Sequence, residues 1–221
     1  MEALQVDAGK VLLINKPLTW TSFDVVNKLR YKLKTKKIGH AGTLDPLATG
    51  LLIICVGKMT KRIDEFMGQE KEYTGKFVLG KTTPSFDLET EISETKDIAH
   101  LTEEMIRNAV LPFIGKISQL PPMHSAIKIG GKRAYQFARR GEEVLLAPRA
   151  VEVREFEITS IALPEVSFRI SCSKGTYIRS LARDLGNSLG VGAYLSSLCR
   201  TRIGTFSLKE ALEVSDVEPL G

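Results

Sequence analysis

Residues 39–52 contain the carboxylate best suited to chemistry in this chain, Asp45. It stands in the stretch Gly-His-Ala-Gly-Thr-Leu-Asp-Pro-Leu-Ala-Thr-Gly-Leu-Leu, between glycines and without an acidic neighbour. Glycine permits backbone conformations that other residues rarely adopt, and Pro46 biases Asp45 away from the helical region. A carboxylate held in this way costs free energy unless it is used or paired. The stretch indicates either a carboxylate that takes part in a reaction or an Asx-type turn, which is the usual role of Asp-Pro in loops.

A single carboxylate limits the reactions that Asp45 could catalyse. It could act as a nucleophile, a base or an electrostatic stabiliser. Retaining sugar chemistry normally uses two carboxylates that lie close together, and no second acid stands in a comparable loop. A reaction that breaks a glycosidic bond and re-forms a bond to the same leaving group needs no separate acid to expel that group. The isolation of Asp45 therefore weakens the case for a hydrolase.

A second stretch, residues 172–184, brings in Arg179. An alternating strand ends near Gly175, and the helix that follows carries Arg179 in its first turn. A guanidinium there could pair with Asp45 and keep the carboxylate ionised in a dry pocket. It could equally pair with Asp184 on the surface of its own helix. Both pairings are open at this point.

Tyr73 and His40 are further candidates with two possible roles each. Tyr73 could offer a ring on which an extruded base stacks, or it could be a half-buried tyrosine of a strand. His40 could contact nucleic acid, or it could be an ordinary turn residue. The residue types alone do not choose between these roles.

Strands and helices are expected to alternate around these residues. Strands are predicted at 11–14, 51–56, 73–79, 151–158 with one bulge, and 166–172. Helices are predicted from Thr21 to residue 33, from Thr102 to residue 113, and from residue 178 to Gly186. An exposed acidic loop is expected at 84–100 and a basic excursion at 123–147. The pattern predicts a single α+β domain with an antiparallel or mixed sheet.

Charge distribution favours an anionic partner. The chain of 221 residues has a net charge of +5. Basic residues gather at 32–37, 128–133, 139–140 and 200–202, and acidic ones at 87–104 and near the C-terminus. This segregation favours a phosphate backbone as partner, although most charge runs are solvated faces. No apolar run is long enough to span a membrane and no secretory signal is visible, so we expect a cytoplasmic protein.

Cysteine and histidine indicate no metal site. The three cysteines are far apart in sequence, and the three histidines show no metal-ligand spacing with them or with one another. Reduced thiols in an apolar core are the expected state of the cysteines.

These stretches resemble the TruB-type tRNA pseudouridine synthases over nearly the whole chain. Residues 39–52 are similar to the family's catalytic motif, G-H-x-G-T-L-D-P-x-A-x-G-x-L, which is highly specific. Residues 15–22 are similar to its first motif, K-P-x-G-x-T-S, and residues 71–87 to its third. The remaining matches are an RNA-gripping thumb insertion at 119–139 and two closing motifs at 175–179 and 198–204.

The resemblance implies isomerisation of uridine to pseudouridine at position 55 in the T loop of tRNA, without a cofactor or a metal. It implies the pseudouridine synthase fold, which is α+β with a mixed, mostly antiparallel central sheet flanked by helices. Asp45 becomes the catalytic carboxylate, Arg179 its ion-pair partner and Tyr73 the ring stacked on the flipped base. The residues implied in RNA or substrate binding are His40, Leu198, Lys16, Lys128, Arg139, Tyr177 and Arg200.

The resemblance also distributes roles around the base. Leu198 would form an apolar wall against it, His40 would stabilise the rearranged T loop, and Lys16 would support the catalytic motif structurally. Extruding a base costs on the order of a few kcal/mol, which stacking and phosphate contacts offset. Asp45 could attack C1′ or remove the C2′ proton, and both routes are open. The expected partner is the T stem-loop of tRNA, bound by a monomer that has no membrane contact.

Four features depart from the family's pattern. Thr19 stands where the first motif has glycine, which predicts a reshaped turn. His124 replaces the aromatic residue expected before the serine of the thumb, which predicts altered RNA contacts, and Thr90 stands where glycine is common. Only fifteen residues follow Phe206, too few for a PUA domain. We therefore expect residues 1–221 to form the catalytic domain, with a thumb-like insertion at about 119–147 and no complete PUA domain.

Two other functions compete with this prediction. A non-catalytic RNA-binding or tRNA-folding module would explain the basic clusters without any need for Asp45. A nucleoside or glycoside hydrolase would use Asp45 but lacks the second carboxylate. Formation of pseudouridine in a T-arm hairpin would distinguish the isomerase from both.

Overall fold

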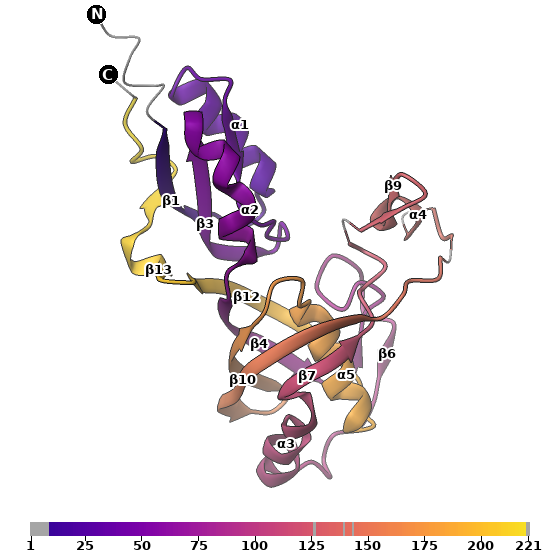
Figure 1. Ribbon diagram of the computed structural model, residues 1–221. Helices are drawn as coiled ribbons and strands as arrows, with labels where there is room; N and C mark the ends of the chain where they lie inside the picture. Colours follow the sequence, from indigo (N-terminus) through magenta and orange to yellow (C-terminus); the bar gives the residue numbers. More distant parts are fainter. Residues whose placement is uncertain (1–8, 126, 139, 143, 220–221) are drawn as a thin grey trace, which may run out of the picture. The chain divides into compact units, whose positions relative to one another are not determined.

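The computed structural model describes residues 9–125, 127–138, 140–142 and 144–219, which form two compact units. Unit 1 contains the chain up to Thr74 and again from Ser197, and unit 2 contains residues 75–196. Strands β4 (Lys71–Leu79) and β12 (Ala193–Ile203) each begin in one unit and end in the other. Both units combine helices with a sheet, which confirms the predicted α+β class (Figure 1).

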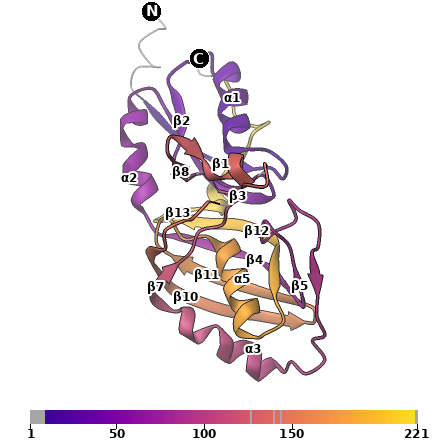
Figure 2. The ribbon, with the colours of Figure 1, turned by 90° about the vertical axis from the view of Figure 1, so that its right-hand side faces the viewer.

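Unit 1 is a mixed sheet with helices on both faces (Figure 2). Its strands follow the order β14-β1-β3-β12-β4, with β2 paired to β3 and β13 paired to β12. Strand β3 is antiparallel to β1 and parallel to β12. The elements of this unit besides β4 and β12 are β1 (Lys10–Lys16), α1 (Ser22–Lys32), β2 (Ile38–His40), β3 (Ala48–Val56), η2 (Gly57–Arg62), α2 (Ile63–Gly68), β13 (Phe206–Ser207), η4 (Leu208–Glu210) and β14 (Leu212–Glu213).

Strand β3 is buried on both faces, as its continuous apolar run predicts. Residues 52, 54 and 56 pack with α1 on one face, and residues 51, 53 and 55 pack with Phe66 of α2 on the other. Burial raises the pKa of the Cys55 thiol to about 11, so this cysteine is a core residue with little thiolate at neutral pH. The strand that follows the Asp45 loop is therefore a rigid part of the core.

Helix α1 begins with the predicted capping box. Thr21 Oγ1 accepts a hydrogen bond from the backbone N–H of Asp24 at 3.0 Å, and the N–H of Thr21 donates to Asp24 Oδ2 at 2.8 Å. In the preceding turn, Thr19 has a φ of +70°. A β-branched residue rarely adopts this left-handed conformation, which favours glycine. The turn thus has a glycine-type backbone in spite of its threonine, and the expected reshaping relative to the family stays a prediction.

Unit 2 holds a sheet of order β12-β4-β11-β10-β7, with helix α5 lying across its strands (Figure 2). Phe77 of β4 stacks on Phe168 of β11 with ring centroids 4.1 Å apart, and Phe156 of β10 meets Phe77 edge-on. The other elements are β5 (Lys81–Thr82), β6 (Glu94–Thr95), α3 (Glu103–Ala109), η3 (Leu111–Phe113), β7 (Gly115–Gln119), β8 (Lys128–Ile129), β9 (Lys132–Arg133), α4 (Ala134–Ala138), β10 (Arg149–Ala162), β11 (Glu165–Cys172) and α5 (Ile178–Ser188).

The predicted helices of unit 2 have different ends and faces. Helix α3 starts at the Thr102 cap but ends at Ala109, and its buried residue is Ile106, whereas Met105 is exposed. Helix α5 does not stop at Gly186 but continues to Ser188. A Cβ atom on Gly186 would lie 2.1 Å from the backbone nitrogen of Ala193, so this glycine permits close packing.

Two loop and strand predictions also need correction. Strand β10 pairs with β11 through two register shifts, between Val153 and Glu155 and between Ile158 and Ser160, where one bulge was expected. Within the predicted exposed loop at 84–100, Ser85 and Asp87 are buried. Tertiary contacts described below account for this burial.

The expected thumb leaves the sheet between two paired strands. Gln119 of β7 lies opposite Arg149 of β10, so the intervening residues form an insertion at the end of an antiparallel pair. In Figure 1 the part that carries β9 and α4 projects away from the sheet of unit 2. Of the thumb residues predicted to bind RNA, Lys128 belongs to β8, and Arg139 lies outside the described residues.

Candidate functional site

The loop that carries Asp45 is tied to the start of helix α1. The backbone oxygen of Asp45 accepts from the N–H of Ala48 at 3.0 Å, which closes a turn. Ser22 Oγ accepts from the N–H of Leu44 at 2.9 Å and donates to the carbonyl of the same residue at 3.3 Å. On the other side of Asp45, the carbonyl of Pro46 accepts from the N–H of Thr19 at 2.9 Å. Both neighbours of Asp45 are therefore held by residues 19–22.

The side chain of Lys16 supports the same loop. Its side chain is fully buried, and Nζ donates to the carbonyl oxygens of Pro17 at 2.9 Å, Trp20 at 2.5 Å and Pro46 at 3.3 Å. Burial lowers the pKa of Lys16 to about 8; the charge of Asp45 opposes this shift and that of Arg200 adds to it. Lys16 is thus a buried cation that organises backbone carbonyls next to Asp45, as the predicted supporting role requires.

Arg200 fixes the two glycine turns of the loop. It lies opposite Gly50 in the β3–β12 pair, and its side chain is 1% exposed. Nε donates to the carbonyl of Leu51 at 2.8 Å, and Nη2 donates to that of Gly42 at 3.2 Å. Gly50 has a φ of +103°, and a Cβ atom there would lie 2.4 Å from the Arg200 carbonyl oxygen. This burial favours a positioning role for Arg200 over the predicted RNA contact.

His40 and Leu198 lie beside the loop in unit 1. His40 ends β2 and pairs with Ile54 of β3. Burial, reinforced by the charge of Arg200, lowers the pKa of His40 below its usual range, so the imidazole is neutral at pH 7. Its buried Nδ1 has no hydrogen-bond partner among the described residues. Leu198 is partly exposed and lies opposite Ala48, three residues after Asp45.

Tyr73 is a buried strand residue. It belongs to β4, and 9% of its surface is exposed. Its neighbour Glu72 accepts a hydrogen bond from Thr201 Oγ1 at 2.7 Å, which ties β4 to β12 in unit 1. Stacking on a base requires access to the ring, so the role of Tyr73 stays a prediction.

In unit 2, a strained loop surrounds the guanidinium of Arg179, whose side chain is 3% exposed. Nη1 lies 3.5 Å from Asp87 Oδ2 and donates to the Ser85 carbonyl at 3.3 Å, and Nη2 donates to the His124 carbonyl at 2.8 Å. Phe86, between Ser85 and Asp87, has a φ of +63°, which a bulky residue adopts only when its surroundings enforce it. These contacts explain why the acidic loop is partly buried.

The alternative partner of Arg179 is engaged elsewhere. Asp184 forms an ion pair with Arg183 at 2.7 Å, and Arg183 also lies 5.0 Å over the ring of Phe86. Asp45 belongs to unit 1 and Arg179 to unit 2, so their pairing stays a prediction.

Tyr177 anchors the start of α5 to the base of the thumb. Its N–H donates to Gln119 Oε1 at 2.8 Å, and Gln119 Nε2 donates back to its carbonyl at 3.1 Å. Gln119 is buried and is the last residue of β7 before the thumb begins. The predicted RNA contact of Tyr177 is untested, but its backbone fixes where the thumb emerges.

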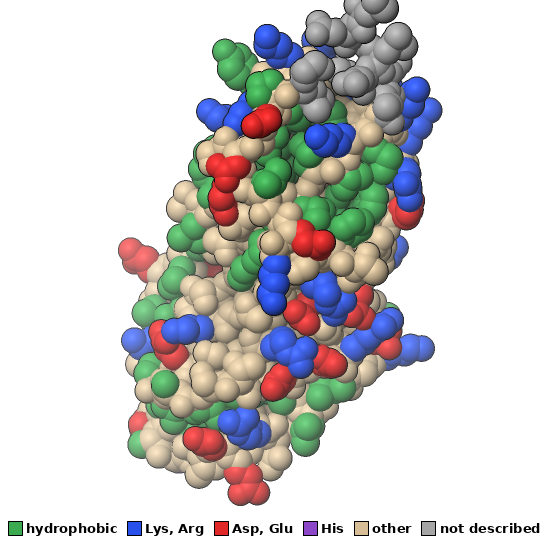
Figure 3. Space-filling model, turned by 90° about the vertical axis from the view of Figure 1, so that its left-hand side faces the viewer, with side chains coloured by type: hydrophobic (Ala, Val, Ile, Leu, Met, Phe, Trp, Pro, Cys, Tyr) green, Lys and Arg blue, Asp and Glu red, His purple; other side chains and the backbone are tan. Residues whose placement is uncertain are grey.

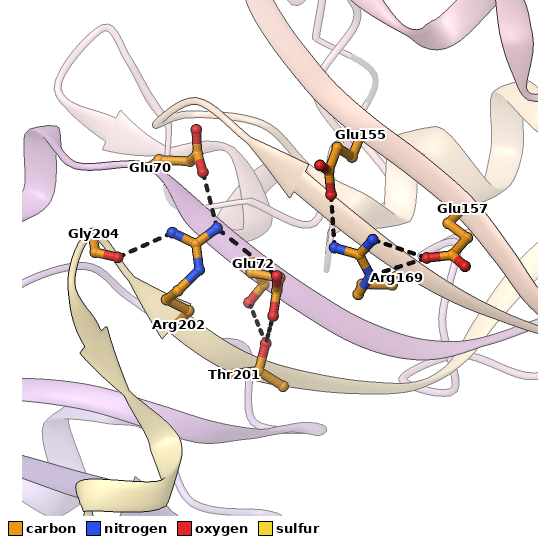
Figure 4. A network of polar contacts seen from close by, with 8 residues as sticks. All are labelled: Glu70, Glu72, Glu155, Glu157, Arg169, Thr201, Arg202 and Gly204. Carbon is orange, nitrogen blue, oxygen red and sulfur yellow. Dashed lines mark hydrogen bonds and ion pairs between the residues drawn. The ribbon is translucent and has the colours of Figure 1, made fainter.

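Several arginines outside these sites are neutralised by acids (Figure 4). In unit 1, Arg202 Nη2 lies 3.0 Å from Glu70 Oε1 and 3.8 Å from Glu72 Oε2. In unit 2, Arg169 lies 2.6 Å from Glu155 and 2.9 Å from Glu157. Such partly exposed pairs contribute little to stability. The basic cluster predicted at 200–202 therefore offers little free positive charge, because Arg200 is buried and Arg202 is paired.

Sequence reasoning missed Ser22, Ser85 and Asp87 as parts of the two sites. Ser22 and Asp87 lie inside motifs that match the family but had no role assigned to them. Their place in these motifs could have indicated that they belong to the site. Ser85 had no signal, because its backbone carbonyl makes the contact. Among the described residues, no cluster of three or more His, Cys, Asp or Glu could hold a metal ion, and no helix is long and apolar enough to cross a membrane.

Comparisons of the sequence with known proteins find relatives of a single family. The family model described as TruB family pseudouridylate synthase (N terminal domain) matches residues 30–178. A protein named tRNA pseudouridine synthase B from Flavobacterium johnsoniae is 55% identical over 214 residues, which is 94% of this chain and 93% of that protein. One of the same name from Parabacteroides distasonis is 52% identical, over 96% of this chain and 92% of the relative.

A solved structure shares the fold. A chain in the crystal structure of a Cbf5-Nop10-Gar1 complex matches with a TM-score of 0.75 and 30% identity, over 98% of this chain and 55% of that chain. The chain thus spans about half the length of this solved chain.

Proposed function

The chain belongs to the TruB family of pseudouridylate synthases and isomerises uridine to pseudouridine in tRNA, and we propose that its target is uridine 55 of the T loop. Its expected fold, the pseudouridine synthase fold, is confirmed by the structural match. The observation that carries the proposal is the Asp45 loop. Its neighbours Leu44 and Pro46 are held by Ser22, Thr19 and Lys16.

We propose Asp45 as the catalytic carboxylate. The reaction breaks the N1–C1′ bond, turns the uracil in place and joins C5 to C1′; the C5 proton leaves and N1 gains a proton. Asp45 either attacks C1′ or removes the C2′ proton. A loop held at both neighbours keeps the carboxylate in one position, and such preorganisation lowers the barrier for the reacting atoms.

The other roles follow from this assignment. Arg179 is proposed to pair with Asp45 and keep it ionised, and its enclosure by Asp87 and two backbone carbonyls suits a rigid guanidinium. Tyr73 is proposed to stack on the base and is a candidate proton acceptor. Leu198 is proposed as the apolar wall.

His40 is proposed to contact the rearranged T loop. Its place at the end of β2, beside the strand that follows the Asp45 loop, and its neutral ring support this role. The thumb residues Lys128 and Arg139 are proposed to bind RNA phosphates, and Tyr177 to contact RNA beside them.

We further propose that residues 1–221 act as one catalytic domain with a thumb at about 119–147, as a monomer in the cytoplasm, where tRNA is the substrate. A T-arm hairpin with tritium at C5 of its uracils tests the activity, because each pseudouridine formed releases one label. The wild type is expected to release the label of one uridine per hairpin, and Asp45→Asn none, with the dissociation constant for the hairpin within about threefold.

The matched control is Asp64→Asn, the same change at an exposed acid of α2 in unit 1, which is expected to keep wild-type turnover. Turnover by Asp45→Asn at the wild-type rate would refute the assignment. Free uracil in solution would instead indicate a hydrolase. Tight binding by the wild type without label release would indicate an RNA-binding module.

A further inference from the structure

Helix α1 carries an unusual pair of exposed rings. Among the aromatic side chains that the structure describes, Phe23 and Tyr31 alone are exposed, at 57% and 86%. With Asn27 and Arg30 they follow a spacing of four, seven and eight residues, which places all four along one face of the helix. The opposite face packs into the core through Val25, Val26, Leu29 and Leu33. The exposed rings are therefore not part of that core.

The segment that contains α1, residues 22–37, carries as much excess positive charge as the whole chain. Residues 22–37 contain six Lys or Arg and one Asp, an excess of five, which equals the net charge of the whole chain. The one acid, Asp24, caps the helix by bonding Thr21. Among the described residues, none of these six cations forms an ion pair.

This contrasts with basic residues elsewhere. In the middle of the face drawn in Figure 3, basic and acidic side chains lie side by side. Arginines such as Arg169 and Arg202 are each held by two carboxylates. The charge of the α1 segment is therefore free to attract an anion, whereas much of the remaining positive charge is neutralised locally.

Arg30 and Phe23 form a ready-made stacking site. The guanidinium carbon lies 5.9 Å from the ring centroid of Phe23, and Nη1 donates to Asn27 Oδ1 at 2.8 Å. An arginine held against an aromatic ring presents a flat, cationic surface, the combination on which unpaired bases stack while phosphates bind nearby. Lys28 on another side of the helix, and Lys34 and Lys36 just beyond its end, are exposed in the same segment.

The helix is rigidly joined to the Asp45 loop within unit 1. Phe23 follows Ser22, whose hydroxyl bonds both backbone groups of Leu44, the residue before Asp45. The lysine-rich end of the segment leads directly into β2, which ends at His40. RNA seated at Asp45 therefore lies within reach of both ends of this segment.

We propose that the side chains of Phe23, Lys28, Arg30, Tyr31, Lys34 and Lys36 in this segment form a second RNA-binding surface of the enzyme. It stacks an unpaired base of the tRNA on the Phe23–Arg30 pair and binds neighbouring phosphates through its lysines. The proposal rests on the tRNA substrate of the proposed function. It adds a contact in unit 1 to the thumb in unit 2.

Binding measured over a range of salt concentrations tests the surface. We expect Phe23→Ala/Tyr31→Ala to weaken binding of a tRNA transcript at least fivefold, with turnover at saturating RNA unchanged. Lys28→Ala/Lys34→Ala/Lys36→Ala is expected to reduce the slope of log affinity against log salt by about two, because each phosphate contact contributes roughly 0.7 to 0.9. Using both a full tRNA and a T-arm hairpin shows whether the contacted nucleotides lie in the T arm.

The control is Lys10→Ala/Lys116→Ala/Lys209→Ala, which removes the same charge from exposed lysines on other elements. If this control lowers the salt slope as much as the α1 triple, the effect is one of net charge and the surface is refuted. Affinity within twofold of wild type for both α1 variants would also refute it. A wild type that binds tRNA through α1 but forms no pseudouridine would support the surface and reject the proposed function.

Discussion

Replacing Lys16 with methionine tests how the Asp45 loop is supported. Methionine has a similar length but lacks the ammonium group, so the carbonyl oxygens of Pro17, Trp20 and Pro46 lose their shared donor. The Pro46 carbonyl keeps the N–H of Thr19, but those of Pro17 and Trp20 lose this donor. Leaving a buried acceptor without a donor costs about 1 to 3 kcal/mol, and part of this is offset because a buried charge is also removed. We expect a loss of about 2 to 4 kcal/mol in the free energy of unfolding at pH 7.

The sharper signature is the pH dependence. The pKa of Lys16 is about 8 in the folded protein against 10.5 for an unperturbed lysine. Between these values the unfolded chain binds more protons than the folded one, so stability rises with pH. At roughly 1.4 kcal/mol per unit, this group adds about 2 to 3 kcal/mol to wild-type stability from pH 7 to pH 10, a gain that Lys16→Met lacks.

The assay is urea unfolding followed by tryptophan fluorescence. The chain has a single tryptophan, Trp20, whose carbonyl accepts from Lys16 and whose ring packs on the core of unit 1. The signal therefore reports on the unit that contains the loop. Lys34→Met, the same change at an exposed lysine, is expected to follow the wild-type pH curve.

Parallel curves would refute the reasoning. If the stabilities of wild type and Lys16→Met differ by a constant amount from pH 7 to pH 10, Lys16 does not titrate as a buried cation. A difference that grows with pH, while Lys34→Met stays with the wild type, supports it.

Two glycine-related substitutions give further predictions. Thr19→Gly relieves a left-handed backbone conformation that costs a threonine about 1 to 2 kcal/mol. Glycine also loses more freedom on folding, which takes back roughly 0.5 to 1 kcal/mol. Urea unfolding should therefore show that the free energy of unfolding rises by about 0.5 to 1 kcal/mol. A loss would show that the threonine side chain is needed in the turn. Gly50→Ala places Cβ 2.4 Å from the Arg200 carbonyl oxygen and should cost more than about 3 kcal/mol. Gly115→Ala, with a similar φ of +100° and no atom within 4 Å of its Cβ, should cost about 1 kcal/mol by the same measurement, and equal losses would mean that backbone strain alone matters at Gly50.

Local patterns predicted most of the elements because short-range physics determines them. Alternation at 166–172 correctly placed Val166, Phe168, Ile170 and Cys172 in the core. The Thr21–Asp24 capping box correctly started α1, since both of its hydrogen bonds are made within four residues. The exact end of α5 was not predictable, because Gly186 is present for its contact with Ala193 and not as a helix stop.

The surroundings of the candidate site were harder to predict because they are assembled from distant residues. Arg179 was a candidate from its motif, but its contacts come from Ser85, Asp87 and His124, which no local pattern links to it. Arg200 stood in a basic cluster, and its burial depends on the pairing of β12 with β3. Charge and motifs thus identified the candidate residues, but only the tertiary structure shows which of them are buried.

The discontinuity of unit 1 has a consequence for synthesis on the ribosome. Asp45 emerges early, but Arg200, which fixes the turns at Gly42 and Gly50, is encoded 155 residues later. At about 5 to 20 residues per second, roughly 8 to 30 s pass between the two. During that interval residues 48–50 of β3 lack their partner strand β12, and this part of the strand edge stands unpaired. A growing chain therefore lacks the Arg200 contacts at Gly42 and Leu51 until β12 has been made, so the order of synthesis delays completion of the Asp45 loop.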